Sequence, residues 1–128
     1  MKSTVALILL VFCLAPNPAL AHHSFASQFD SSKPVTLRGV VARLEWTNPH
    51  SWLYVDAKDE GGNLTHWQCE LVSPNQLKRL GWSRDSVKVG DQLTVEGFRA
   101  RNDENTCYAR IVKTPDGKRV FGEEGRNQ

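Results

Sequence analysis

The 128-residue sequence predicts a mainly β domain with one short helix, preceded by an export signal. Strand-like alternation of apolar and polar residues recurs in five segments, and turn-forming residues separate them. A single segment after the third strand changes to helical spacing and carries capping residues at both ends. A chain of this length has room for one domain.

The first residues form a pattern of their own. Met1-Lys2 is a short basic start, residues 5–14 are continuously apolar, and Ala19-Leu20-Ala21 fits the cleavage pattern of small residues. This arrangement predicts a secretory signal peptide over residues 1–21, cleaved after Ala21. The apolar run is far shorter than the roughly 20 residues that cross a bilayer, so we expect no membrane span after cleavage.

Because the signal peptide predicts export, we expect the protein in the periplasm, which is an oxidising compartment. Cleavage removes Cys13 and leaves Cys69 and Cys107, an even pair that predicts a disulfide. Two buried free thiols are the alternative, because free cysteine also buries readily. With 16 Lys and Arg against 14 Asp and Glu, and Lys2 removed by cleavage, the chain is close to neutral. Such a charge offers no general attraction for nucleic acid, and we expect no nucleic-acid partner.

The rest of the chain divides into three parts. Residues 22–34 are mostly polar and predict an N-terminal leader that lies across the domain. Residues 35–121 contain all the periodic segments and predict the folded domain. Residues 122–128 read as a flexible tail.

The first two strands meet at a corner. Residues 35–46 predict a long first strand, with a bulge at Gly39 where the alternation changes phase. Asn48-Pro49 is a turn signal, and residues 51–58 alternate again as a second strand. The corner between the two strands therefore carries His50.

The remaining elements follow in order. Residues 59–63 are a glycine-containing turn, and residues 64–71 predict the third strand, so the first three strands form a meander. Ser73 as an N-cap, Pro74 at the first helical position and Gly81 at the end predict a helix between them. Residues 92–98 and 106–113 predict the fourth and fifth strands, followed by a short segment at 119–121.

Three meandering strands, a helix and two further strands are the element order of a five-stranded oligonucleotide/oligosaccharide-binding (OB) barrel. In that order the fifth strand lies beside the third, so Cys69 and Cys107 become neighbours. Both also have the parity of core residues, which supports the disulfide. A small open α+β sheet is the rival arrangement.

The solvent face of the meander predicts the ligand-binding surface. If the turn after Lys58 is symmetric, His66 lies opposite Asp56, Gln68 opposite Tyr54 and Glu70 opposite Trp52, while around Asn48-Pro49 Glu45 lies near Trp52 and Arg43 near Tyr54. Polar and aromatic side chains then share one face, as they do at the binding face of OB proteins. Aromatics among hydrogen-bonding groups suit a peptide, a glycan or a partner protein in the periplasm. The predicted ligand-binding residues are Arg43, Glu45, Trp52, Tyr54, Gln68 and Glu70. The alternative is that the leader or the tail covers Trp52 and Tyr54.

Histidines predict a metal site. Cleavage after Ala21 would make His22 the first residue, with a free α-amino group beside its imidazole, and these nitrogens suit Cu(II). We expect His22, His23 and His50 to hold copper if the leader folds back to the corner. His66 lies on the order of 20 Å away along the meander and is left out. The alternatives are a disordered polar start for His22 and His23, and a turn histidine for His50.

Signals for catalysis are weaker. The sequence contains no Gly-x-Ser-x-Gly, phosphate-binding loop, dinucleotide fingerprint or His-Glu-x-x-His. Glu45 and Glu70 beside Trp52 would suit a hydrolase with paired carboxylates, but charged residues on an exposed strand face are the commoner explanation. We therefore expect a binding module, with a hydrolase as the third hypothesis.

Several short motifs resemble a family of small exported bacterial proteins, the domain of unknown function 6152. The most specific are the His22-His23-Ser24-Phe25 start and the corner Trp46-Thr47-Asn48-Pro49-His50, and Ser73-Pro74-Asn75 and Gly81-Trp82 also fit. The resemblance covers essentially the whole chain after Ala21. It implies an exported single-domain protein and carries no assigned activity. The two cysteines are not part of the family pattern.

Overall fold

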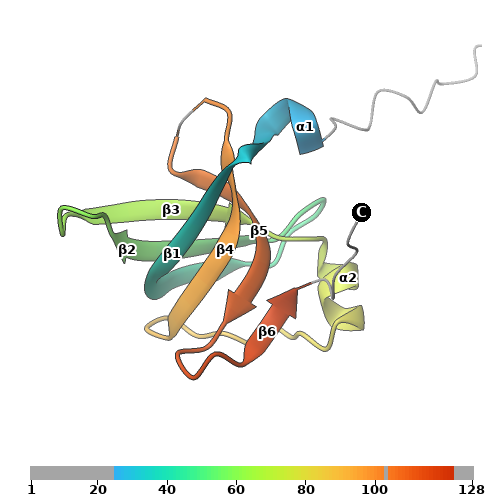
Figure 1. Cartoon of the computed structure of the whole chain (residues 1–128). Helices are drawn as coiled ribbons and strands as arrows, with labels where there is room; N and C mark the ends of the chain where they lie inside the picture. Colours follow the sequence, from blue (N-terminus) through green and yellow to red (C-terminus); the bar gives the residue numbers. More distant parts are fainter. Residues whose placement is uncertain (1–24, 103, 123–128) are drawn as a thin grey trace, which may run out of the picture.

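The structure is a computed structural model that describes residues 25–102 and 104–122. Within these residues the chain is mainly β, with two short helical segments (Figure 1). None of the described helices is long and apolar enough to cross a membrane. The elements are α1 (Phe25–Gln28), β1 (Phe29–Glu45), β2 (Trp52–Lys58), β3 (Leu64–Glu70), α2 (Pro74–Arg79), β4 (Gln92–Ala100), β5 (Thr106–Lys113) and β6 (Arg119–Gly122).

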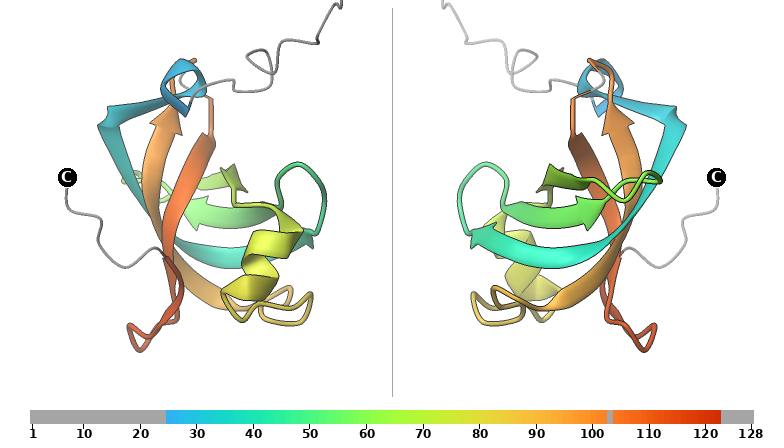
Figure 2. Two further views of the ribbon diagram at one scale, coloured as in Figure 1. Left: turned by 90° about the vertical axis from the view of Figure 1, so that its right-hand side faces the viewer. Right: turned by 90° about the vertical axis from the view of Figure 1, so that its left-hand side faces the viewer.

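The six strands form one sheet in the order β3-β2-β1-β4-β5-β6. Neighbours in this order are antiparallel, and β3 additionally pairs with β5 in parallel. Through that pairing the hydrogen-bonded neighbours β1, β2, β3, β5 and β4 form a closed cycle, which curves around the core (Figure 2). Strand β6 continues the sheet beyond β5.

Strand β1 is shared between two neighbours. It pairs with β4 from Phe29 to Val40 and with β2 from Gly39 to Glu45. The expected bulge at Gly39 is wrong, because the register shift lies between Val41 and Arg43. Gly39 instead permits close approach, since a Cβ there would lie 2.3 Å from the carbonyl oxygen of Asp56.

The strand also begins earlier than the sequence indicated. Phe29 already pairs with Ala100 of β4, so the second half of the predicted leader belongs to β1. The register shifts between Phe29 and Pro34, where the residues are polar and either exposed or half-buried. Alternation is therefore absent there, and a long-range pairing decides the conformation.

The predicted helix is confirmed as α2. Ser73 caps it by accepting a hydrogen bond from the Gln76 amide, and the Gln76 side chain accepts one from the Ser73 amide, which completes a capping box. Trp82 follows the helix and is buried, with its ring edge-on to Phe121 at 5.9 Å. The indole nitrogen donates to the Val120 carbonyl. These contacts hold β6, which makes the sheet six-stranded instead of five-stranded.

Cys69 and Cys107 are register partners across the parallel β3–β5 pairing, so their predicted adjacency is confirmed. Both side chains are fully buried. They are free thiols in this structure, and the predicted disulfide is not formed. The hydrogen bond with Cys107, together with burial, raises the pKa of Cys69 well above its ordinary value.

Replacing Gly39 by alanine tests the close approach of β1 and β2. The added Cβ would overlap backbone that cannot move without breaking the pairing, so Gly39→Ala should lower the free energy of unfolding by about 2 kcal/mol or more. Gly61→Ala is the matched control, because its Cβ would meet only the flexible Asn63 side chain at 3.1 Å and the carboxylate of Asp59. Equal losses in urea unfolding of the two variants would contradict this role for Gly39.

Because the Cys69 and Cys107 thiols are adjacent, we expect them to form a disulfide on oxidation. A protein beginning at His22, which lacks Cys13, should form the Cys69–Cys107 disulfide when refolded with a glutathione redox couple. Closing a loop of this length should raise the free energy of unfolding by up to about 4 kcal/mol. The double variant Cys69→Ala/Cys107→Ala should show no dependence on reductant. Two titratable thiols in the unfolded, oxidised preparation would overturn the expectation.

Candidate functional site

The corner between β1 and β2 is fixed to the end of β3. The Ser51 amide donates to the Val72 carbonyl at 3.1 Å, and the Leu71 amide donates to the Ser51 carbonyl at 2.9 Å. Within the corner, the Thr47 hydroxyl donates to the His50 carbonyl at 3.0 Å. His50 is therefore held beside the last residue of β3.

That last residue is Glu70, and it forms a close pair with His50. The Nδ1 of His50 lies 2.5 Å from a carboxylate oxygen of Glu70. The Glu70 side chain is 7% exposed, whereas the His50 side chain is 50% exposed. Burial raises the pKa of Glu70, and His50 opposes that rise. The pair thus joins a buried carboxylate to an imidazole that reaches solvent.

The start of the described chain lies against the same region. The Arg101 amide donates to the Gln28 carbonyl at 2.9 Å, and the Arg101 guanidinium lies 3.8 Å from Asp30. Phe29 is buried, with its ring 5.8 Å from that of Tyr108. Tyr108 is the register partner of Glu70 across β3 and β5. The segment at the end of α1 is therefore anchored next to Glu70.

A surface pocket of about 300 Å³ is lined by this segment together with residues of β2, β3 and the β4–β5 loop. Ser27 and Gln28 line it on one side, and Trp52 and Glu70 line it on the other. Trp52 is half-buried and lines this pocket together with Ser27 and Gln28. His22 and His23 lie outside the described residues, a few positions before α1.

The estimated registers of the meander are confirmed. His66 is opposite Asp56, Gln68 opposite Tyr54, and Glu70 opposite Trp52, while Glu45 and Arg43 lie opposite Trp52 and Tyr54. The predicted binding residues therefore share one face of the meander. One detail differs, because Glu70 is buried rather than exposed on that face.

Three of the predicted binding residues interact with one another. The Arg43 guanidinium lies 4.0 Å from the centroid of the Tyr54 ring, and it forms an ion pair of 3.0 Å with Glu45. The Tyr54 hydroxyl donates to Glu45 at 3.1 Å. The Arg43 guanidinium thus already occupies one face of the Tyr54 ring. Glu45 is paired with Arg43 and Tyr54, and Glu70 is paired with His50.

His66 belongs to a different place. Its Nδ1 lies 2.6 Å from Asp56, and its side chain is mostly exposed, near the far end of the hairpin. The structure separates it from the corner, as the register predicted. Among residues 25–102 and 104–122, no group of three or more His, Cys, Asp or Glu side chains is placed to hold a metal ion.

The His50–Glu70 pair defines what the corner can do chemically. A carboxylate at Nδ1 keeps the proton on that nitrogen and leaves Nε2 as a lone-pair donor. This is the arrangement that metal-binding histidines usually have, with a carboxylate fixing the ring orientation and increasing its basicity. The Nε2 of His50 is therefore the atom of this pair that could accept a hydrogen bond or bind a metal ion.

The sequence did not indicate the part played by Ser27 and Gln28 at this site. Their only signal was the expectation that the leader crosses the domain, which named no contact. Phe29, an apolar residue within a polar stretch, was the residue that could have located the anchor.

The fold and the corner define a small, mainly β domain with a carboxylate-supported histidine beside its N-terminal segment. Residues 10–109 match the family of unknown function named DUF6152, and the chain belongs to this family. Comparison with curated proteins and with solved structures found no match to this chain.

Removal of the Glu70 charge should change how stability depends on pH. Because the folded pKa of Glu70 is raised, its contribution to stability is full below its ordinary pKa, near 4.5, and is lost as pH rises through the folded value. The free energy of unfolding of the wild type, relative to Glu70→Gln, should therefore fall as the pH rises above about 4.5.

Urea unfolding at a series of pH values measures this difference. Glu60→Gln, which changes an exposed carboxyl in the β2–β3 turn, is the matched control and should run parallel to the wild type. If the difference in free energy of unfolding between wild type and Glu70→Gln stays constant or grows with pH, burial does not dominate the pKa shift of Glu70.

Proposed function

We propose that this protein is an exported, periplasmic OB-like binding module that holds a copper ion through His22, His23 and His50. The observation that carries the proposal is the His50–Glu70 pair, in which a buried carboxylate orients an imidazole whose other nitrogen is available. The proposal assigns no catalytic residue.

The strand pairings support the OB-like part of the proposal. A β1-β2-β3 meander, a helix between β3 and β4, and a β5 that pairs with both β4 and β3 are the connections of an OB barrel. In such barrels the outer face of the meander and its loops are the usual binding surface. The His50 corner lies at the edge of that surface.

The position of the N-terminal segment supports the ligand set. Ser27 and Gln28 line the same cavity as Glu70, and the Arg101–Gln28 hydrogen bond fixes them there. His23 lies four positions before Ser27, and because residues 25–28 are helical, this interval spans less than the fully extended length of about 14 Å. The proposal requires that the residues before α1 turn back toward the His50 corner.

The chemistry of the donors favours copper over other metals. An α-amino nitrogen and imidazole nitrogens in a tetragonal arrangement are the preference of Cu(II). The structural zinc sites of proteins use closed tetrahedral sets with cysteine thiolates, and Cys69 and Cys107 are buried in the core. In this proposal Glu70 positions His50 and does not itself bind the metal.

A metal-free module that binds a peptide, glycan or partner protein on the Trp52/Tyr54 face is the alternative. It receives less support, because the Arg43 guanidinium lies over the Tyr54 ring and Trp52 lines the cavity beneath the N-terminal segment. A ligand on this face would have to displace contacts that the protein already makes.

Calorimetric titration with Cu(II) tests the copper proposal. Protein beginning at His22 should bind one equivalent, and an additional glycine before His22 should weaken binding because the amine moves away from the imidazole. His50→Gln should lower the affinity by about tenfold or more. His66→Gln is the matched control, since His66 also pairs with a carboxylate, and it should bind as the wild type does.

Two results would contradict the proposal. One is equal binding by protein with and without the extra glycine, which would exclude the N-terminal amine. The other is equal affinity of the His50→Gln and His66→Gln proteins, which would show that the corner takes no part.

A further inference from the structure

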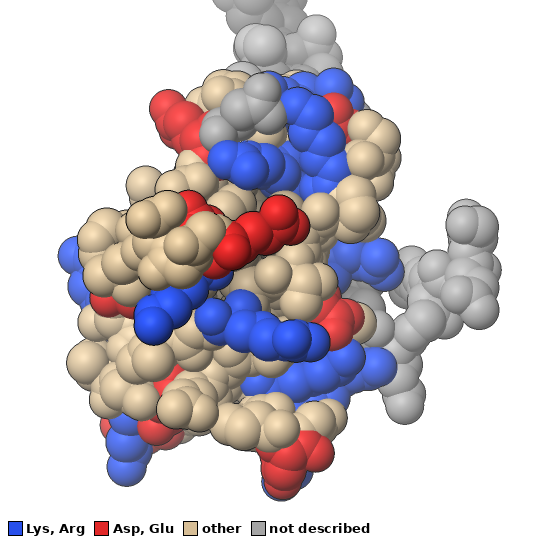
Figure 3. Space-filling model, turned by 60° about the vertical axis from the view of Figure 1, so that its left-hand side comes forward, with Lys and Arg blue, Asp and Glu red and all other residues tan. Residues whose placement is uncertain are grey.

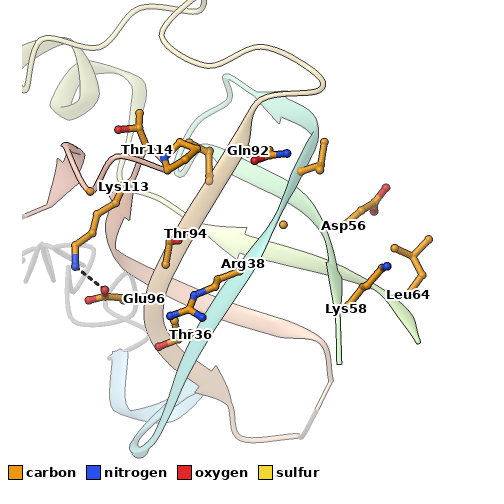
Figure 4. A pocket seen from close by; sticks show the side chains of 15 residues that line it. Thr36, Arg38, Asp56, Lys58, Leu64, Gln92, Thr94, Glu96, Lys113 and Thr114 are labelled. Atoms are coloured by element: carbon orange, nitrogen blue, oxygen red, sulfur yellow. Dashed lines mark hydrogen bonds and ion pairs between the residues drawn. The ribbon is translucent and has the colours of Figure 1, made fainter. Parts of the chain in front are cut away.

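The outer face of β1 and β4 carries a groove that neither the corner nor the meander face includes. Its volume is about 910 Å³, and its floor comes from the outward side chains of β1 and β4. Leu64, after the β2–β3 turn, borders it on one side, and the β5–β6 turn at Thr114 borders it on the other. Figure 4 shows these side chains spread across one face of the sheet, from Lys113 at one edge to Leu64 at the other.

A row of cationic side chains crosses the floor of this groove. Arg38 of β1 is the register partner of Thr94 of β4, which is the register partner of Lys113 of β5. On the other side of β1, Ala57 is opposite Gly39, so Lys58 follows beside Arg38. Three strand spacings bring the row to about 14 Å. The row therefore presents three cations and a hydroxyl across four strands.

The acidic groups of the groove do not balance this row. Asp56 is paired with His66 at 2.6 Å, and Glu96 is paired with Lys113 at 2.6 Å. Among residues 25–102 and 104–122, Arg38 and Lys58 have no carboxylate within ion-pair distance. Like charges opposite each other on neighbouring strands are destabilising, and a bound anion would relieve that repulsion. Figure 3 shows Lys and Arg side chains gathered on this side of the molecule, with acidic groups among them.

The surroundings of Arg38 suit a ligand rich in hydroxyl groups. In Figure 4 the guanidinium extends across the sheet toward the hydroxyls of Thr36 and Thr94. Val40 and Leu64, which line the same groove, are two of the large apolar residues that remain exposed in the structure. Hydroxyl donors, an apolar patch and a planar guanidinium fork together fit a carboxylate carried on a sugar ring.

We infer that this groove binds an acidic oligosaccharide, with uronate carboxylates on Arg38 and Lys58. A chain of uronate units carries its charges at intervals along a hydroxylated backbone, as the row requires. Nucleic acid fits less well, because single strands bind by stacking bases on aromatic rings and no aromatic residue lines the groove. This site is separate from the His50 corner and does not depend on copper.

Binding of tetragalacturonate to the purified protein tests the inference. Calorimetry or fluorescence should show saturable binding that weakens with salt, and Arg38→Gln and Lys58→Gln should each weaken it by about tenfold. Arg84→Gln removes an exposed arginine outside the groove and should bind as the wild type does. Neutral maltotetraose should not bind.

The variants are informative only if folded, and thermal unfolding of each gives that control. Should one groove variant fail to fold, the other carries the test. Absence of saturable binding to tetragalacturonate, unchanged affinity in the folded groove variants, or equal binding of maltotetraose would overturn the inference. Tighter binding of a dodecathymidylate strand than of tetragalacturonate would assign the groove to nucleic acid instead. His50→Gln should leave tetragalacturonate affinity unchanged, which separates this site from the copper proposal.

Discussion

The double pairing of β1 is the constraint on which the rest of the structure depends. One strand of 17 residues hydrogen-bonds to β4 in its first part and to β2 in its second, and Gly39 pairs with both. Only a residue without a side chain fits there, because the carbonyl of Asp56 lies where a Cβ would be. This sharing draws the β2–β3 hairpin and the β4–β5 pair around one core and lets β3 meet β5.

The same constraint assembles the corner. The start of β1 runs beside the end of β4, while its own end leads into the turn at His50. Pairing of β3 with β5 then places Glu70 beside Tyr108, on which Phe29 packs. The N-terminal segment and the corner each lie beside Glu70, because β3 pairs with β5. Burial of Glu70 costs desolvation energy, and the contact with His50 offsets part of it.

Local patterns in the sequence predicted much of the fold. The alternation of period two and the symmetric turn after Lys58 were enough for the meander registers, and Ser73, Pro74 and Gly81 were enough for α2. Residues 29–34 escaped prediction because their strand conformation depends on β4, about seventy residues away along the chain. Burial of Glu70 depends on the same long-range contact. The row of cationic side chains could not be predicted from the sequence either, since Arg38, Thr94 and Lys113 become neighbours only through the β1–β4–β5 register.

The proposed copper site depends on the His50 imidazole, oriented by Glu70, acting as a metal ligand. Electron paramagnetic resonance of protein beginning at His22, loaded with one equivalent of Cu(II), tests it most directly. If His50 is a ligand, the spectrum should be tetragonal, with nitrogen hyperfine couplings that change in His50→Gln and stay unchanged in His66→Gln. Identical spectra for the wild type and His50→Gln would contradict it.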